Sequence, residues 1–153
     1  MDDFKHILAP TDFEPASAGA LQLATSLAAE FGAKITLLHV WEISLYPYMD
    51  SSMNTEIMYR IEQAAKDQLA ASLAQVQLLL PNAEARLEIG LPAPTILEMI
   101  PKLGVDLVVL GTHGRHGLSH TLLGSVAEQV VRASQVPVFT VHTQPATPSP
   151  SSS

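Results

Sequence analysis

The chain is organised around Leu107-Val108-Val109-Leu110-Gly111-Thr112-His113-Gly114, which is followed after nine residues by Gly124-Ser125. The apolar run at its start is typical of a buried strand, and the valines after Ser125 predict a helix. A strand, a glycine-bearing loop and a helix start in this order favour a phosphate site. Glycine lets backbone N–H groups approach an anion, and the first turn of a helix carries unpaired N–H donors. We expect Ser125 at the N-cap of this helix, where it offers a hydroxyl and an amide.

Apolar strand patterns and helical patterns alternate along the chain. We expect strands at residues 6–9, 34–40, 84–89, 106–110 and 137–141. This alternation gives a parallel sheet with right-handed crossovers. The third segment alternates apolar and charged residues, as a strand near a sheet edge does. Edge positions for the third and fifth strands fit the order 3-2-1-4-5. The fold class is therefore α/β, a single-domain, open, five-stranded parallel sheet with helices on both faces.

Helical patterns fill the connections between these strands. We expect helices at residues 15–31, 57–80, 94–103 and 125–134. Gly32 is a stop signal for the first helix, and Pro81-Asn82 ends the second. Pro101 falls inside the third, and we expect it to break or kink that helix because proline removes a backbone hydrogen bond.

Two segments lie outside the strand and helix patterns. Residues 41–53 read as a loop, and we expect its Tyr46 and Tyr48 to cover the edge of the core. Residues 143–153 are rich in Pro, Ser and Thr, with nothing to bury. We expect this tail to be disordered and the folded domain to span residues 1–142.

Composition narrows the classes of function. The 153 residues include 15 acidic and 8 basic side chains, and the net charge of −7 argues against binding to nucleic acid. The absence of cysteine excludes disulfides, thiol catalysis and Cys-based metal sites. Neither a signal peptide nor the ~20-residue apolar run of a membrane span is recognisable. We expect a cytoplasmic protein that does not associate with membranes.

The expected topology brings two distant stretches together. The first strand ends in Pro10-Thr11-Asp12, and the predicted strand order places Asp12 beside Gly111, where the sheet reverses direction. Open α/β sheets bind their ligands in that crevice. Taken alone, Asp12 is more often a turn or helix-cap residue in such a position. The convergence of the two stretches is the best support that the residues give for a nucleotide site.

At these residues the chain resembles the ATP-binding branch of the universal stress protein family. The resemblance rests on Gly111-x2-Gly114-x9-Gly124-Ser125, Ala9-Pro10-Thr11-Asp12 and Leu38-His39-Val40, and it covers about Phe4 to His142. It implies a Rossmann-like, adenine nucleotide alpha-hydrolase-like fold that binds ATP, with Mg²⁺ or Mn²⁺. It further implies that the glycine motif holds the phosphates, that Asp12 contacts the ribose or the metal, and that the Val40 backbone pairs with adenine. The implied site also includes Pro10, Thr11, Leu110, Gly111, Gly114, Gly124, Ser125 and Val126.

The loop after Gly114 contains further charged and titratable residues. Arg115 is its fixed cation and a candidate phosphate contact, the alternative being a solvated loop residue. His113, His116 and His120 lie on a loop without an accompanying carboxylate, which does not favour a metal site. The P-loop and its lysine are absent, so fast phosphoryl transfer has no evident source of electrostatic stabilisation.

Three functions are open. The one we expect is an ATP-binding stress or regulatory protein, whose nucleotide sets its conformation or its choice of partner. A scaffold of the same fold that has lost the nucleotide is the second, and the retained glycines speak against it. The third is a slow ATPase, for which the sequence offers no convincing general base beyond Asp12 acting through a metal.

The last predicted strand suggests a homodimer. Residues 137–141 are nearly all apolar and lack the charges that discourage edge-to-edge association. We expect this strand to pair antiparallel with its copy across a two-fold axis, which the family resemblance also implies.

Overall fold

Strands and helices alternate through the residues that the computed structural model describes, which are 3–42, 51–112 and 124–142. The strands are β1 (His6–Pro10), β2 (Lys34–Trp41), β3 (Glu84–Ile89), β4 (Leu107–Gly111) and β5 (Val138–Val141). The helices are α1 (Pro15–Phe31), α2 (Ser51–Gln77), α3 (Pro92–Leu103) and α4 (Ser125–Ala133).

The strands form one parallel sheet of five in the order β3-β2-β1-β4-β5, which confirms the predicted fold class. The chain reverses its direction of winding between the central strands β1 and β4. Their ladder reaches the Leu8–Val108 pair, whereas β1 continues to Pro10 and β4 to Gly111. The two central strands therefore separate towards their carboxyl ends, and this separation opens a crevice.

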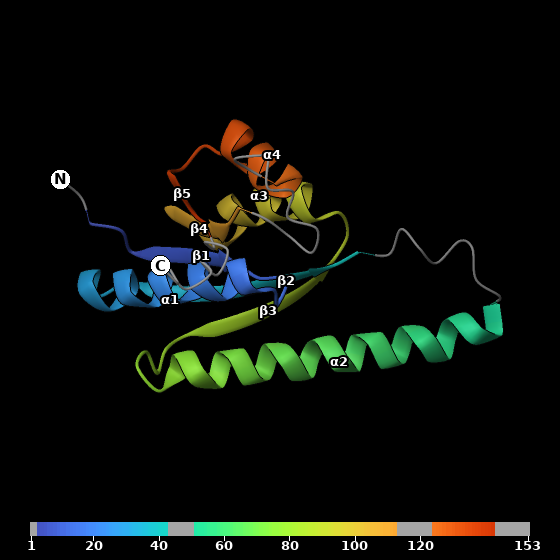
Figure 1. The fold of residues 1–153 in the computed structure, drawn as a ribbon. Helices are drawn as coiled ribbons and strands as arrows, with labels where there is room; N and C mark the ends of the chain where they lie inside the picture. The colour runs from blue at the N-terminus through green and yellow to red at the C-terminus, as the bar shows by residue number, and fades with distance from the viewer. Residues whose placement is uncertain (1–2, 43–50, 113–123, 143–153) are drawn as a thin grey trace, which may run out of the picture.

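Two layers of helices cover the sheet (Figure 1). Helices α1 and α2 pack on one face, around a buried cluster that includes Ile7, Ile35 and Val109. Helices α3 and α4 pack on the other, around a cluster that includes Leu8 and Val108. Adjacent residues of each strand thus serve opposite cores, as the pleat of a strand requires.

Helix α1 lies close to the sheet because the residues on its buried face have small side chains. The buried residues at spacings of four are Ala16, Ala20, Ala24 and Ala28. Pro15 occupies its first turn, and Gly32 closes it with a left-handed φ of 67° while donating its N–H to the Ala28 carbonyl. The first turn of α1 is held directly against β4.

Several predicted boundaries differ from the structure by a few residues. Strand β2 continues through Trp41, and α3 begins at Pro92 rather than Pro94. Helix α2 begins at Ser51, within the segment 41–53 that was expected to be a loop, and ends at Gln77 rather than Leu80. Leu78 and Leu79 form tighter turns there, with their N–H groups bonded to carbonyls three residues back. The apolar pattern continues past the helix because leucines recur, although Leu78 is 82% exposed.

The predicted break at Pro101 is wrong, because α3 runs through it to Leu103. Only two residues of the helix follow the proline, so few backbone bonds depend on it. Gly104 then takes a left-handed φ of 70° and donates its N–H to the carbonyls of Ile100 and Pro101. Met99 and Ile100 are buried beside this turn. Packing and a well-bonded helix end outweigh the local cost of the proline.

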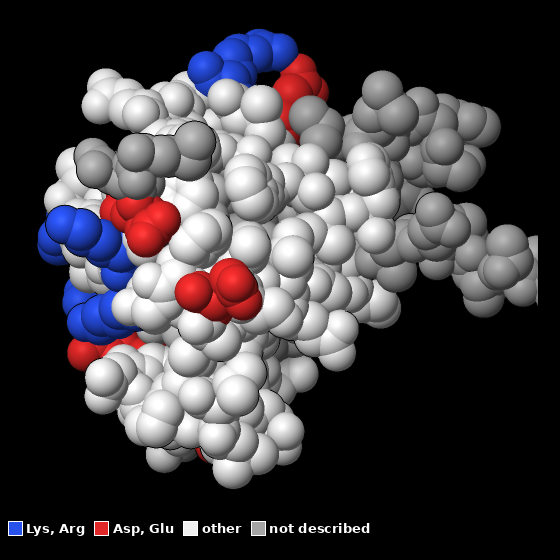
Figure 2. Space-filling view, turned by 90° about the vertical axis from the view of Figure 1, so that its left-hand side faces the viewer, with Lys and Arg blue, Asp and Glu red and all other residues white. Residues whose placement is uncertain are grey.

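Figure 2 shows the side of the molecule on which the strands begin, and its charged side chains form small groups among uncharged surface. Within the described residues, no helix is both long enough and apolar enough to cross a membrane. The predictions for Tyr46, Tyr48 and the tail 143–153 fall outside the described residues.

Candidate functional site at the carboxyl end of the sheet

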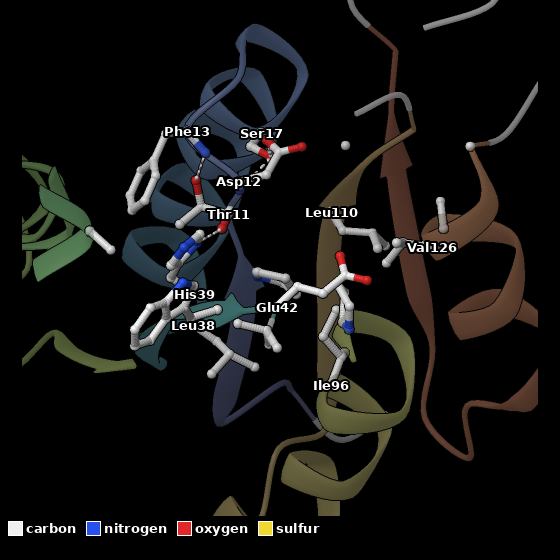
Figure 3. A pocket seen from close by; sticks show the side chains of 18 of the residues that line it. Thr11, Asp12, Phe13, Ser17, Leu38, His39, Glu42, Ile96, Leu110 and Val126 are labelled. Atoms are coloured by element: carbon white, nitrogen blue, oxygen red, sulfur yellow. Dashed lines mark hydrogen bonds between the residues drawn. The ribbon is translucent and has the colours of Figure 1, made fainter. Parts of the chain in front are cut away.

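A cavity of about 680 Å³ opens at the carboxyl ends of β1, β2 and β4, beside the first turn of α4 (Figure 3). Every predicted site residue that the structure describes lines this cavity: Pro10, Thr11, Asp12, Val40, Leu110, Gly111, Gly124, Ser125 and Val126. Gly114 and Arg115 lie outside the described residues. The topology thus gathers the ends of three strands and the start of one helix around a single space.

Val40 lies where β2 extends beyond the end of β1. Thr11 donates its backbone N–H to the Leu38 carbonyl at 2.8 Å, which continues the contact between the two segments past Pro10. Alternate residues of a strand direct their N–H and C=O groups to the same neighbour. Those of Val40 therefore face the space beyond β1, where they offer a ligand one donor and one acceptor.

The Asp12 carboxylate is fixed by the turn that leads into α1. Its Oδ1 accepts hydrogen bonds from the Ser17 hydroxyl at 2.7 Å and from the Glu14 N–H at 2.9 Å. The Ser17 oxygen in turn accepts the Asp12 N–H at 3.2 Å. Asp12 is therefore a turn residue, as its position after a strand suggests, and it lines the cavity as well (Figure 3).

The next residue, Phe13, has a backbone conformation that residues other than glycine rarely adopt. Its φ of 66° is in the left-handed region, and its N–H donates to the Thr11 hydroxyl at 3.0 Å. The Phe13 ring packs on the His39 ring, with centroids 4.5 Å apart. His39 Nδ1 donates to the Thr11 carbonyl at 2.8 Å. Two rings from different strand ends are thus fixed at the cavity wall.

The start of α4 differs from the prediction by one residue. Gly124 is the N-cap, because its carbonyl accepts the N–H of Glu128 at 2.9 Å, and Ser125 is the first residue of the helix. Gly124 donates its own N–H to the carbonyl of Thr112 at the end of β4. This bond joins the N-cap of α4 to the residue that follows β4. Ser125 keeps its amide and hydroxyl in the first turn, beside the cavity.

Gly111 has a packing role that its sequence context does not reveal. A Cβ built on it would lie 2.6 Å from the carbonyl carbon of Ala16 and 2.8 Å from its carbonyl oxygen. Both are backbone atoms of the first turn of α1 and have little freedom to move. Gly111 is thus required for the close approach of α1 to β4, whatever the cavity binds.

A profile of the universal stress protein family matches residues 3–142. The chain belongs to the universal stress protein family. Universal stress protein MJ0531 of Methanocaldococcus jannaschii is 31% identical to it over 142 residues, which are 90% of this chain and 82% of that protein. The structure of universal stress protein UspA from Lactobacillus plantarum has a TM-score of 0.82 at 25% identity, covering 92% of this chain and 99% of that one.

Two solved structures of the same fold contain nucleotides. A universal stress protein in complex with cAMP has a TM-score of 0.66 at 22% identity, covering 94% of this chain and 100% of that one. The universal stress protein of Archaeoglobus fulgidus in complex with dAMP has a TM-score of 0.59 at 17% identity, covering 92% of this chain and 99% of that one. At these sequence identities, the similarity of the two structures to the present chain concerns the fold alone.

The charges around the cavity are acidic where the structure describes them. Its described lining includes the carboxylates of Asp12 and Glu42 and contains no lysine or arginine. Figure 3 shows the Glu42 side chain reaching across the cavity towards Leu110 and Val126. An anion here would rely on backbone N–H groups, the α4 dipole and an accompanying cation. Among the described side chains, no three His, Asp or Glu residues are grouped so as to hold a metal ion.

Several lining residues were not predicted. Trp41 and Glu42 directly follow Val40, and the continuation of β2 past Val40 was the signal for them. Others come from elements that the glycine motif does not indicate: Phe13, Ser17, Ile61, Ala64, Ala65, Gln68, Pro92 and Ile96. On α2, Ile61 and Ala65 belong to the apolar stripe that the sequence assigns to the core, whereas Gln68 has ordinary surface character, and only the packing of this universal stress protein fold brings them to the cavity.

Proposed function

We propose that this universal stress protein binds ATP in the cavity and acts as a nucleotide-dependent regulatory protein in a stress response. One observation carries the proposal. The Gly124-Ser125 helix start and the exposed backbone edge of Val40 line the same cavity, although they are far apart in the sequence. One suits a phosphate group and the other suits the edge of a base.

The phosphate end would be the first turn of α4. Helix N-termini attract anions through unpaired N–H groups and the helix dipole. Ser125 and Val126 contribute the first amides, and the Ser125 hydroxyl adds a donor. The extended backbone of Gly124, with φ −70° and ψ 168°, presents no side chain at this point. In the proposal, Gly114 and Arg115 complete the contacts from the loop.

The base end would be the carboxyl end of β2. Adenine carries a ring-nitrogen acceptor beside its N6 amino donor, which matches the N–H and C=O of Val40. Leu38, Ile96 and Leu110 provide apolar contacts for the faces of a base. The cAMP and dAMP complexes of other universal stress proteins support this choice, since both ligands are adenine nucleotides.

A regulatory role fits the site better than rapid catalysis does, because the described lining has no lysine or arginine to stabilise the charge of phosphoryl transfer. A polyphosphate would meet the Asp12 carboxylate, which favours binding together with Mg²⁺ or Mn²⁺. Asp12 is the residue that we assign to the metal or the ribose. Its Oδ1 is already held by Ser17 and Glu14, so the carboxylate is oriented before a ligand arrives.

Calorimetry of ATP binding tests the site through Asp12. Asp12→Ala should weaken ATP binding by about 1.5–3 kcal/mol, roughly 10- to 150-fold. Asp12→Asn keeps an acceptor for the turn and isolates the effect of the charge. If Asp12 holds a metal, both losses should shrink when Mg²⁺ is omitted. Asp67→Ala, an exposed acid on α2, is the matched control. Unchanged affinity of both Asp12 variants, with and without Mg²⁺, would leave Asp12 as a turn residue only.

We also propose a homodimer through β5, the edge strand next to β4. Val138 and Val141 are half-buried, and Phe139 is 39% exposed although its ring packs edge-on against Phe4. An apolar strand at a sheet edge favours pairing with a second copy. Replacing Val138 and Val141 with lysine should convert the dimer to a monomer by light scattering. A wild-type protein that is monomeric at micromolar concentration would contradict the proposal.

A further inference from the structure

The cavity extends to both faces of the sheet. Alternation along β2 directs Leu38 and Val40 towards α3, and directs His39 and Trp41 towards α2. All four residues line the same cavity. The space therefore passes around the carboxyl ends of the strands. The part that faces α2 is lined by Phe13, His39, Trp41, Ile61, Ala64, Ala65 and Gln68, and we call it the α2-side recess.

The recess adjoins Thr11, which bonds to both Phe13 and His39, but it lies apart from the phosphate end of the proposed nucleotide site. Figure 3 shows Phe13 and His39 on one side of the pocket and Leu110 and Val126 on the other. The start of α4, where the phosphates would lie, belongs to the second side. A nucleotide held by Val40 and Ser125 would thus leave the recess to another molecule.

The walls of the recess suit a flat ring. Phe13 and His39 stack with an interplanar angle of 34°, and the buried indole of Trp41 follows on the same face of β2. The exposed Ala64 and the buried Ala65 on α2 also line the recess, and neither has a bulky side chain that would fill it. Aromatic pairs stabilise one another by offset stacking or edge contact, and a third ring would extend the stack.

The recess also contains an oriented hydrogen-bond acceptor. Because a carbonyl only accepts, the contact with Thr11 requires that His39 Nδ1 carry the proton. In the neutral ring, Nε2 is then an acceptor. The remaining polar lining is the uncharged amide of Gln68. None of the residues that line the recess carries a fixed charge, so the recess offers a charged ligand no ion-pair partner.

We propose that the α2-side recess is a second binding site, separate from the nucleotide site, for a neutral, flat aromatic or heteroaromatic molecule that donates one hydrogen bond. The rings of Phe13, His39 and Trp41 contact its faces and edges. Its N–H or O–H group donates to His39 Nε2. A small metabolite of this class would bind the nucleotide-bound protein without competing for the phosphate end.

Trp41 provides a direct readout, because it is the single tryptophan of the chain. Its indole N–H gives one signal in a two-dimensional ¹H–¹⁵N spectrum, which can be followed while benzamide is added. Benzamide is flat and neutral and carries an N–H donor. We expect saturable shifts with a dissociation constant on the order of 1 mM, as for small fragments. Acetophenone, of the same shape without the donor, should bind about fivefold more weakly or worse.

Matched variants on α2 locate the probe. Ala64→Leu places a larger side chain in the recess and should weaken benzamide binding by about tenfold or more, while ATP affinity stays within about twofold. Ala70→Leu makes the same change at an exposed position of α2 that does not line the cavity, and it should alter neither. Equal melting temperatures of the two variants would show that Ala64→Leu folds normally. Saturating ATP should leave benzamide binding within about twofold.

Four outcomes would overturn the proposal. The first is the absence of saturable shifts with benzamide. The second is equal affinity for acetophenone, which would remove the role of His39 Nε2. The third is unchanged benzamide binding by Ala64→Leu, which would put the probe elsewhere. The fourth is displacement of benzamide by ATP, or a parallel loss of ATP affinity in Ala64→Leu, which would make the recess part of the nucleotide site. The proposed ATP site survives the first three outcomes, and the binding of ATP itself is tested separately through Asp12.

Discussion

The two ends of the same sheet are built differently. At the amino end, polar groups are bonded to one another: the Asp106 carboxylate accepts the backbone N–H groups of Lys5 and His6 at 2.9 and 3.0 Å. His6 Nδ1 also donates to the Leu103 carbonyl at 3.1 Å, and Nε2 contacts the Thr36 hydroxyl at 2.7 Å. These contacts connect the start of β1 to β2, to the end of α3 and to the segment before β4.

At the carboxyl end, polar groups surround a space instead. The backbone edge of Val40, the carboxylate of Asp12 and the first turn of α4 all border the cavity. The strands are continuous between the two ends, so their sequences serve two purposes at once. The amino end stabilises the fold, and in our proposal the carboxyl end binds the ligand. Substitutions at the two ends should therefore change different measured quantities.

The largest effect is expected from Gly124→Val. Its backbone lies in an extended region that valine also adopts, so the unfolding free energy should change by less than about 1 kcal/mol. The branched side chain would occupy the space that the phosphates need. ATP affinity should fall more than about 100-fold, equivalent to about 2.7 kcal/mol. Calorimetry and urea denaturation measure the two quantities, and ATP binding within about threefold of wild type would show that the site is assigned wrongly.

Gly111→Ala should behave differently from Gly124→Val. Gly111 also lies at the carboxyl end of the sheet, but we expect its substitution to lower the stability of the fold. The added methyl would clash with the Ala16 backbone at 2.6 Å. Relieving that clash requires α1 to move away from β4, at a cost of about 1–3 kcal/mol in the unfolding free energy. Urea denaturation measures this cost. Normal stability combined with loss of ATP binding would mean that Gly111 serves the phosphates rather than the packing.

The smallest effect concerns His6 and pH. Burial lowers the pKa of His6 from its ordinary value of 6.5, and Lys34 lowers it further, while the Leu103 carbonyl, Asp106 and Glu84 act in the opposite direction. The folded protein thus favours the neutral ring. Its contribution to stability is complete above pH 6.5 and is lost as the pH falls from 6.5 through the lower pKa of the folded state.

Unfolding free energies measured across this pH range test the role of His6. The wild-type protein should lose stability towards acid more steeply than His6→Gln, which cannot titrate at this position. ATP affinity of His6→Gln should match that of wild type, since His6 lies at the opposite end of the sheet. Identical pH profiles of the two proteins would contradict a neutral, half-buried His6.

Much of the fold could be predicted from local patterns. The apolar runs around Ile7, Ile35 and Val108 indicated buried strands, and the charged alternation at Glu84–Ile89 indicated an edge strand. Each of these patterns involves only residues that are close in the sequence. They identify each strand as buried or as an edge strand, and the strand order follows from that assignment. The same patterns placed Asp12 and Gly111 in one crevice.

The remaining features depend on contacts between distant residues. Gly111 reads as part of a phosphate loop, but the atoms that leave no room for a side chain there belong to Ala16, which is distant in the sequence. Pro101 reads as a helix breaker, but burial of Met99 and Ile100 keeps α3 intact around it. Gln68 reads as an ordinary surface residue, and only the packing of α2 on β2 brings it to the cavity. None of these contacts has a signal in the local sequence.

Amide chemical shifts during titration with Mg²⁺ and ATP test the central claim most directly, because they report on both ends of the sheet at once. We predict saturable shifts at the carboxyl end, in the amides of Thr11, Val40 and Ser125, with little change at Lys5 and His6. Shifts concentrated at the amino end, or none at ATP concentrations up to about 1 mM, would contradict a nucleotide site at the carboxyl end of the sheet.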